Sequence, residues 1–109
     1  MNSPHLVGQH LLVDGYLTRP LTSALISSIL SGLTNHTQLT ALGPPLVHHN
    51  SHGWVGFQMI AESHISLHTQ AERFFLDVFS CKEFGVQGVL DYVREWGKPY
   101  HTQVLDRST

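Results

Sequence analysis

The sequence predicts an α+β fold, a two-layer sandwich with two helices on one face of a mostly antiparallel sheet. Short stretches in which apolar and polar residues alternate, as they do in strands, occur near both ends of the chain and in a long run through its middle. Two other stretches repeat apolar residues every three or four positions, as amphipathic helices do. The resulting order is β-α-β-β-β-β-α-β, and helices separated by such a run of strands pack together on one face of a sheet.

Six strands are expected, each bounded by residues that favour turns. Proline cannot donate a hydrogen bond to a strand ladder, so the Gly-Pro-Pro at 43–45 should end the second strand. The Asn-Ser-His-Gly at 50–53 is a turn signal that should precede the third. The expected strands cover residues 5–16, 37–42, 54–61, 65–69, 74–81 and 100–105.

Two helices are expected between these strands. The first should begin near Thr18, with a proline tolerated in its first turn, and end near His36. The second should run from about Glu83 to Trp96, with Gly97 as its C-terminal cap. One face of the first helix collects its large apolar residues, which are Leu21, Leu25, Ile26, Ile29, Leu30 and Leu33.

Length and composition limit the classes of function. With 109 residues, the chain should form one domain over residues 1–109. Only 13% of its residues are charged, and a small, weakly charged domain often buries part of its surface in an oligomer, so we expect self-association. A net charge of −2 without a Lys/Arg cluster argues against nucleic acid as a partner. We expect no signal peptide and no membrane segment, and the single cysteine favours the reducing cytoplasm.

The residues best suited to chemistry lie in the stretch 54–81. Its centre is Glu62-Ser63-His64, and a second histidine, His68, follows five residues after the serine. These two residues could act together if the chain bends sharply between them, although the spacing alone does not identify a site. No G-x-S-x-G turn surrounds Ser63, so a hydrolase pair is not indicated. Strand alternation should direct Ile65, Leu67 and Thr69 to one face and His64, Ser66 and His68 to the other.

The sequence ESHISLHT at 62–69, followed by Glu72 and by DVFSC at 77–81, resembles the core of the bacterial and archaeal S-adenosylmethionine decarboxylases. The opening G-x-H-L-L-x-D at 8–14 resembles the first strand of that family. The resemblance implies a similar α+β fold and a small-molecule substrate of the amino-acid type. Together with the small size of the chain, it also implies a homodimer. It further implies that the chain cuts itself into residues 1–62 and 63–109, that Ser63 becomes a pyruvoyl cofactor, and that the enzyme serves polyamine and spermidine biosynthesis.

The resemblance also assigns roles to single residues. Glu62 and Ser63 form the cleavage site, His68 assists the cleavage, and Cys81 is the catalytic proton donor. Glu72 and Asp14 occupy positions used for substrate recognition. As an isolated residue, Cys81 or His68 would more often be structural, and the two carboxylates would equally well be solvated surface charges.

These residue types suit the chemistry. A serine hydroxyl held against the preceding carbonyl can exchange the amide for an ester, and a nearby base can then eliminate that ester. Hydrolysis of the resulting dehydroalanine leaves a pyruvoyl group. The pyruvoyl ketone forms a Schiff base with a substrate amine and takes up the electrons released as carbon dioxide leaves, after which a thiol can protonate the carbanion.

The histidines also raise the question of a metal site. Three of them are clustered at His48, His49 and His52, and His64 and His68 follow. Their spacing matches no tight zinc pattern, and the chain has one thiol, so we expect no bound metal.

The chain departs from the family pattern at three places. Val55 stands where the family commonly has a serine that assists processing, and Gln70 replaces a common tryptophan. An aromatic residue that packs against adenine in relatives is replaced near His49. Two alternatives therefore stay open beside decarboxylation of S-adenosylmethionine. One is the same chemistry on L-ornithine or L-arginine, and the other is an unprocessed, non-catalytic regulatory homologue.

Overall fold

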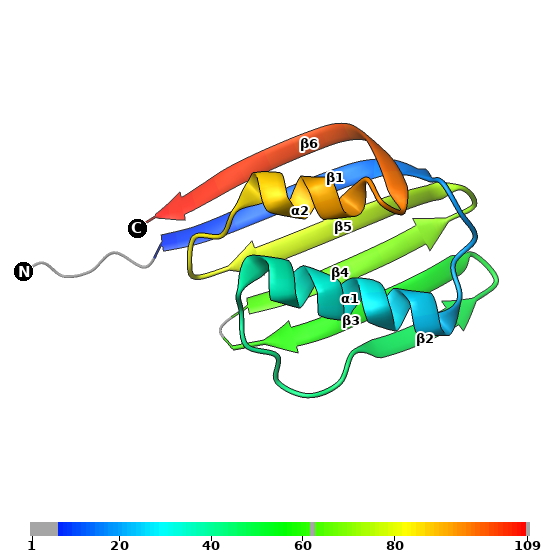
Figure 1. Cartoon of the computed structure of the whole chain (residues 1–109), viewed down its shortest axis with the longest axis horizontal. Coiled ribbons are helices and arrows are strands. Elements are labelled where there is room, and N and C mark those ends of the chain that lie inside the picture. Colours follow the sequence, from blue (N-terminus) through cyan, green and yellow to red (C-terminus); the bar gives the residue numbers. More distant parts are fainter. Residues whose placement is uncertain (1–6, 62, 109) are drawn as a thin grey trace, which may run out of the picture.

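The computed structural model describes residues 7–61 and 63–108. It confirms the predicted α+β class and the predicted order of elements (Figure 1). The elements are β1 (Val7–Leu17), α1 (Ser23–Thr37), β2 (Leu46–Asn50), β3 (Gly53–Ile60), β4 (Ser63–Gln70), β5 (Arg73–Ser80), α2 (Val86–Val93) and β6 (Gly97–Ser108).

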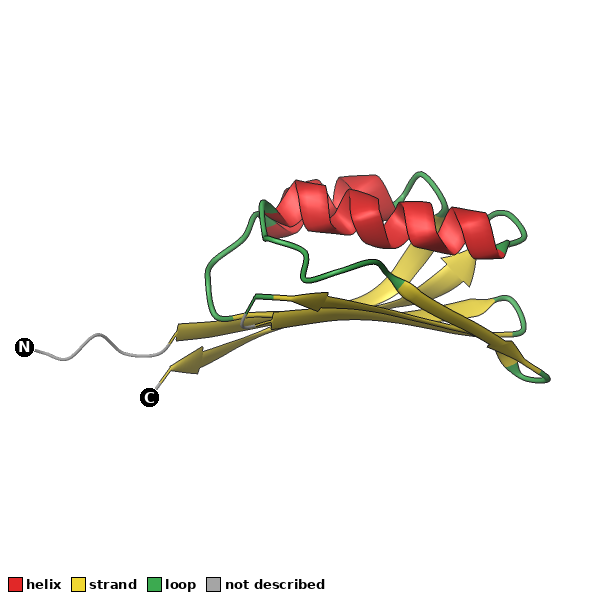
Figure 2. Ribbon diagram, turned by 90° about the horizontal axis from the view of Figure 1, so that it is seen from below, coloured by secondary structure: helices red, strands yellow, loops and turns green. Residues whose placement is uncertain are grey.

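The six strands form one sheet in the order β2-β3-β4-β5-β1-β6, and all neighbours are antiparallel. Two residues connect β3 to β4, and two more connect β4 to β5, so these strands form a continuous meander. Both helices lie over the same face of the sheet, and no element of the described residues covers the other face (Figure 2). Within the described residues, neither helix is long and apolar enough to cross a membrane.

Local interactions define the ends of α1. Thr22 caps its N-terminus, because the Thr22 hydroxyl oxygen accepts a hydrogen bond from the Leu25 N–H at 3.1 Å. The helix ends where Gln38 adopts a left-handed conformation with φ of 59° and donates its N–H to the carbonyls of Asn35 and Thr34. The expected start near Thr18 was therefore wrong by about one turn.

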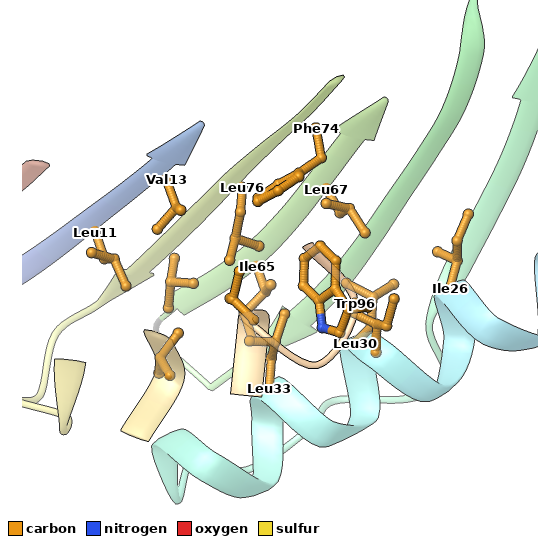
Figure 3. Close-up of a cluster of buried hydrophobic side chains, with 14 of the residues drawn as sticks. Leu11, Val13, Ile26, Leu30, Leu33, Ile65, Leu67, Phe74, Leu76 and Trp96 are labelled. Atoms are coloured by element: carbon orange, nitrogen blue, oxygen red, sulfur yellow. The ribbon is translucent and has the colours of Figure 1, made fainter. Parts of the chain in front are cut away.

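A single apolar core lies between the helices and the sheet (Figure 3). Residues of α1 at helical spacing, including Ile26 and Leu30, are fully buried, as are alternate residues of the central strands such as Leu67. Each such side chain contributes about 1.5–3 kcal/mol by leaving water. Gly56 of β3 permits the close approach of α1, since a Cβ there would lie 2.8 Å from Ile26 Cγ2.

The second helix is shorter than the expected 83–96. Phe84 is held outside it by Gln9, whose side-chain amide donates to the Phe84 carbonyl at 3.3 Å and accepts from the Phe84 N–H at 3.3 Å. Gly97 does not cap the helix, because the cap is Arg94 and Gly97 opens β6. Trp96 between them is buried against Phe74, with the ring centroids 4.9 Å apart.

The expected strand at 37–42 was wrong. Thr37 is still helical, and the segment that follows makes only an isolated bridge between Ala41 and Ile60. The strand lies after the two prolines instead, at Leu46–Asn50. As an edge strand that begins after Pro45, β2 needs no N–H from either proline. The third to fifth strands lie within two residues of expectation, and β6 is longer than the expected 100–105.

Alternation along the strands gives the sheet two different faces. On β1, β3, β4 and β5, most side chains toward the helices are buried, whereas those on the bare face, called here the open face, are partly or fully exposed. The predicted division of β4 is confirmed, with Ile65, Leu67 and Thr69 buried toward the helices. The open face carries His10, Leu12, Asp14 and Tyr16 of β1, Leu46 and His48 of β2, Val55, Phe57 and Met59 of β3, His64, Ser66 and His68 of β4, and Phe75, Asp77 and Phe79 of β5.

Candidate active site

Ser63 is the first residue of β4 and follows the two-residue connection from β3. It is half-buried and is paired with Ile60 across the hairpin. β4 runs without interruption from Ser63 to Gln70, so the bend between Ser63 and His68 that would let them act together within one chain is absent. Glu62, the other residue of the predicted cleavage site, lies outside the described residues.

Cys81 follows the last residue of β5 and lies beside Ser63. The backbone N–H of Cys81 donates a hydrogen bond to the Ser63 hydroxyl oxygen at 3.3 Å. Antiparallel pairing of β4 with β5 produces this contact, because the pair of His64 with Phe79 brings the start of one strand to the end of the other. Cys81 is a free thiol and is half-buried. Ser63 and Cys81, 18 residues apart in sequence, therefore share one end of the sheet.

His68 lies at the other end of β4. Five residues of extended strand span roughly 16 Å, so the His68 imidazole is not near the Ser63 hydroxyl of the same chain. His68 is exposed on the open face, where its direct neighbours are Val55 on β3 and Phe75 on β5. The open face is hollowed here over about 410 Å³, lined in part by these three residues and Gln70.

Asp14 and Glu72, the two predicted substrate-binding carboxylates, lie at the same end as His68. Asp14 is half-buried on β1 and lies directly opposite Phe75, which pairs in turn with His68. Glu72 is exposed in the connection between β4 and β5, where its carbonyl accepts a hydrogen bond from the Leu17 N–H at 2.7 Å. The predicted site residues thus lie at two ends of the sheet, and alternation along β4 directs Ser63 to the same side as Ile65 while His68 lies on the open face.

Tyr16 also belongs to this end, although its sequence position did not single it out. It lines a second hollow of about 470 Å³ together with Gln70, Glu72 and Arg73. Tyr16 is 45% exposed, Tyr100 lies beside its ring with the centroids 5.0 Å apart, and the Arg73 guanidinium carbon lies over the ring at 6.0 Å from its centroid. A signal was available in the sequence, because Tyr16 follows Asp14 by two residues and must therefore share its face.

A group of polar side chains lies next to Ser63. Asp77 of β5 accepts a hydrogen bond from the His10 Nε2 on β1, and the same Asp77 oxygen lies 4.0 Å from His64 Nε2 on β4. His10 belongs to the opening motif and Asp77 to the DVFSC motif, but sequence reasoning gave neither a role. In the described part of the chain, no three or more His, Cys, Asp or Glu side chains are arranged to hold a metal ion.

The chain is similar to known proteins in both sequence and fold. The chain matches the S-adenosylmethionine decarboxylase family over residues 9–108. A relative from Archaeoglobus fulgidus, an S-adenosylmethionine decarboxylase proenzyme, is 33% identical over 110 residues that cover 94% of this chain and 98% of the relative. A proenzyme of the same name from Hydrogenobaculum sp. (strain Y04AAS1) is 30% identical over 114 residues, which cover 93% of this chain and 81% of the relative.

A solved structure shows the same fold. The adenosylmethionine decarboxylase from Aquifex aeolicus aligns with a TM-score of 0.69 at 21% identity, over 95% of this chain and 91% of that chain. The two-layer fold, the match along nearly the whole sequence and the two relatives lead to one assignment. This chain belongs to the S-adenosylmethionine decarboxylase family.

Proposed function

We propose that this chain cleaves itself between Glu62 and Ser63 and then decarboxylates S-adenosylmethionine with a pyruvoyl group made from Ser63, as a step of spermidine biosynthesis. Membership of the family makes it a decarboxylase of the adenosylmethionine type. Both relatives are named proenzymes, which supports self-processing. The observation that carries the proposal is the hydrogen bond from the Cys81 N–H to the Ser63 hydroxyl, because it joins the predicted nucleophile to the predicted proton donor.

Self-cleavage proceeds in balanced steps. Ser63 Oγ adds to the Glu62 carbonyl carbon and the Ser63 nitrogen leaves, so that the amide becomes an ester and residue 63 gains a free amine. A base removes the Cα proton of residue 63, the bond between its Cβ and Oγ breaks, and the Glu62 carboxylate leaves with that oxygen. Water then replaces the nitrogen of the remaining dehydroalanine and releases ammonia. The products are residues 1–62 and a chain of residues 63–109 that begins with pyruvoyl.

The surroundings of Ser63 fit such a group. The pyruvoyl ketone supplies a sink for the electrons that carbon dioxide leaves on the substrate. We assign Cys81 as the residue that holds the proton for the substrate carbon, since a half-buried thiol beside residue 63 can act as a general acid. A thiol in this role must stay reduced, and for that reason we expect the protein to act in the cytoplasm.

His68 can serve as the base only if a second copy supplies it. Within one chain it lies roughly 16 Å along β4 from Ser63. In a homodimer with the two open faces together, a two-fold axis that crosses the strands exchanges the ends of the face. The end of the sheet that holds Ser63 and Cys81 in one protomer then lies opposite the partner's His68. We therefore propose a homodimer with two shared sites.

The chemistry of the open face supports this pairing. Leu46 and Met59 are 65% and 54% exposed on it, more than expected of apolar side chains facing water permanently. Phe57 on β3 and Phe75 and Phe79 on β5 lie on the same face and are only partly covered. A second copy would bury these side chains.

Residues near the partner's His68 then bind the adenosine part of the substrate. Glu72 can accept hydrogen bonds from ribose hydroxyls, and the Tyr16 ring in the same hollow, over which the Arg73 guanidinium lies, offers a purine a stacking surface. Tyr16 therefore compensates for the tryptophan that Gln70 replaces. Neither relative is named for ornithine or arginine, and this aromatic surface favours the larger, adenosine-containing substrate.

Release of labelled carbon dioxide tests the activity. S-adenosylmethionine, L-ornithine and L-arginine, each labelled in the carboxyl group, are supplied separately to the purified protein. We expect release from S-adenosylmethionine at a rate at least ten times that from either amino acid. Faster release from ornithine or arginine would contradict the substrate, and no release from any of them in a protein that has cleaved itself would contradict the decarboxylase.

Mixed dimers test the shared site. Chains with Ser63→Ala and chains with His68→Ala are expressed separately and together, and the cleavage of each is followed by mass. A shared site predicts that neither variant cleaves alone and that only the His68→Ala chain cleaves in the mixture, since its Ser63 meets the partner's His68. Cleavage of His68→Ala on its own, or no cleavage in a verified mixed dimer, would contradict the arrangement.

A further inference from the structure

One carboxylate on the open face is shared by two imidazoles from different strands. His10 Nε2 on β1 hydrogen-bonds to Asp77 Oδ1 on β5, and His64 Nε2 on β4 lies 4.0 Å from the same oxygen. The side chain of His10 is 15% exposed, against 33% for Asp77 and 38% for His64. The most buried member, His10, thus holds the carboxylate, and the carboxylate faces the most exposed ring.

The hydrogen bond defines which nitrogen of His10 carries a proton. An ionised carboxylate has no proton to give, so His10 must donate from Nε2. His10 Nδ1 is buried and has no hydrogen-bond partner among the described residues. Asp77 is therefore the hydrogen-bonding group around which the His10 ring is oriented.

The ring of His64 is held on its other sides by two phenyl rings. Phe57 lies nearly parallel to it at 5.9 Å between centroids, with 19° between the planes, and Phe79 lies at 5.8 Å. Phe79 also packs edge-to-face against His10, with the centroids 5.6 Å apart. Residues from both neighbouring strands, β3 and β5, therefore border the His64 ring and restrict its orientation.

His64 has a particular place in the chain because it directly follows Ser63. Cleavage before Ser63 removes the covalent link between β3 and β4 and turns residue 63 into a new chain end. New ends fray unless side-chain contacts hold them. His64 is the first residue after the cut that keeps its peptide bonds on both sides. The contacts of its ring with Asp77 and the two phenyl rings therefore determine how firmly residue 63 stays beside Cys81.

From these contacts we infer that His10 and Asp77 are positioning residues, which act through His64 to hold the cleaved end of β4 against Cys81. The inference rests on the proposed function, since it concerns the end that self-cleavage creates. The role requires a hydrogen-bond donor at position 10 and an acceptor at position 77. It does not require that either residue exchange a proton during the reaction.

Paired substitutions separate positioning from proton transfer. Glutamine at position 10 keeps a donor near the place of His10 Nε2 but cannot titrate, whereas alanine removes the donor. We expect His10→Ala and Asp77→Ala to lower kcat about tenfold with KM changed less than about twofold, because a small displacement of a reacting group lowers the rate this much. His10→Gln should stay within about threefold of the unmodified protein. Rates are normalised to the cleaved fraction measured by mass.

Controls of matched chemistry lie on the helices. His36→Ala in α1 and Asp91→Ala in α2 remove an exposed histidine and an exposed aspartate far from this face, and both should leave kcat unchanged. An unchanged kcat in both His10→Ala and Asp77→Ala would overturn the inference. So would equal losses in His10→Gln and His10→Ala, or a pH profile of His10→Gln displaced from that of the unmodified protein, since these would indicate proton transfer.

A second measurement does not depend on activity. In a Ser63→Ala chain, scalar couplings across the His64 Cα–Cβ bond should report a single rotamer. Addition of His10→Ala or Asp77→Ala should produce averaged couplings, and addition of His10→Gln should not. Unchanged couplings in both alanine variants would overturn the positioning role even if the protein decarboxylates S-adenosylmethionine. If the alanine variants give averaged couplings but the unmodified chain never cleaves itself, the contacts position His64 and only the proposed function is contradicted.

Discussion

Val55 lies directly opposite His68 across the β3–β4 pair, so the imidazole has an isopropyl group beside it where the family commonly has a serine hydroxyl. We predict that Val55→Ser accelerates self-cleavage. One added hydrogen bond of about 1.4 kcal/mol in the transition state corresponds to roughly a tenfold faster rate. The half-time of cleavage, followed by mass after synthesis of the chain in vitro, measures the effect. Leu42→Ser, which replaces an exposed apolar residue outside the site, is the control.

A slower or unchanged rate in Val55→Ser would mean that His68 works without a neighbouring hydroxyl. Complete cleavage of the unmodified chain with Val55 in place would exclude the alternative in which this residue keeps the protein an intact regulatory homologue.

Cys81→Ala should separate the two reactions of the site. We expect the variant to cleave itself, because the contact with the Ser63 hydroxyl comes from the backbone N–H of residue 81 and survives the substitution. Decarboxylation should fall by about 100-fold or more, the usual effect of removing a general acid. Mass spectrometry and carbon dioxide release measure the two results on the same sample. Full decarboxylation by a cleaved Cys81→Ala chain would remove the proton-donor assignment.

Tyr16→Ala should weaken binding of S-adenosylmethionine. Stacking of a base on an aromatic side chain contributes about 1–3 kcal/mol, so KM should rise at least about fivefold. Tyr16→Phe keeps the ring and is the matched control, for which we expect an unchanged KM. If Tyr16→Ala binds the substrate as well as Tyr16→Phe, the purine lies elsewhere than the hollow beside Glu72.

Stability at alkaline pH should depend on Tyr92, whose hydroxyl donates to the Ser28 carbonyl at 3.2 Å. Burial raises the pKa of Tyr92 above its ordinary value of 10.0, and the nearby charge of Glu95 adds to the shift. The folded chain therefore keeps this proton at a pH where the unfolded chain releases it. This contribution is fully present below pH 10 and is lost as the pH rises through the folded-state pKa.

We predict that Tyr92→Phe loses less stability between pH 9 and pH 11 than the unmodified protein, because it has no phenol to ionise. Midpoints of urea unfolding at several pH values measure this difference, and parallel curves for the two proteins would contradict it. At pH 8 the variant should be slightly less stable, by at most about 1 kcal/mol for the lost hydrogen bond.

Much of the fold was predictable because strands such as β4 show regular alternation of apolar and polar residues. Ile65, Leu67 and Thr69 alternate with more polar residues, and the structure buries the first set toward the helices. The strand β2 was not predictable in the same way. Proline argues against a strand in the middle of a sheet, but β2 begins after Pro45 at an edge, where the missing N–H has no effect.

The candidate site was predictable only in part. The neighbourhood of Ser63 and Cys81 follows from the β4–β5 pairing, and the motif already suggested it. The distance between Ser63 and His68 also follows from strand geometry, whereas the proposed homodimer that would bring them together has no signal in the strand pattern of one chain. The contact of His10 with Asp77 joins strands 67 residues apart and has no local pattern.

The mass of the purified chain under denaturing conditions tests the central claim most directly. The proposal predicts two species, residues 1–62 and residues 63–109 with a pyruvoyl group at the new end, and a single uncut species for Ser63→Ala. An unmodified chain that stays whole after prolonged incubation, or a Ser63→Ala chain that is cut at the same bond, would contradict it.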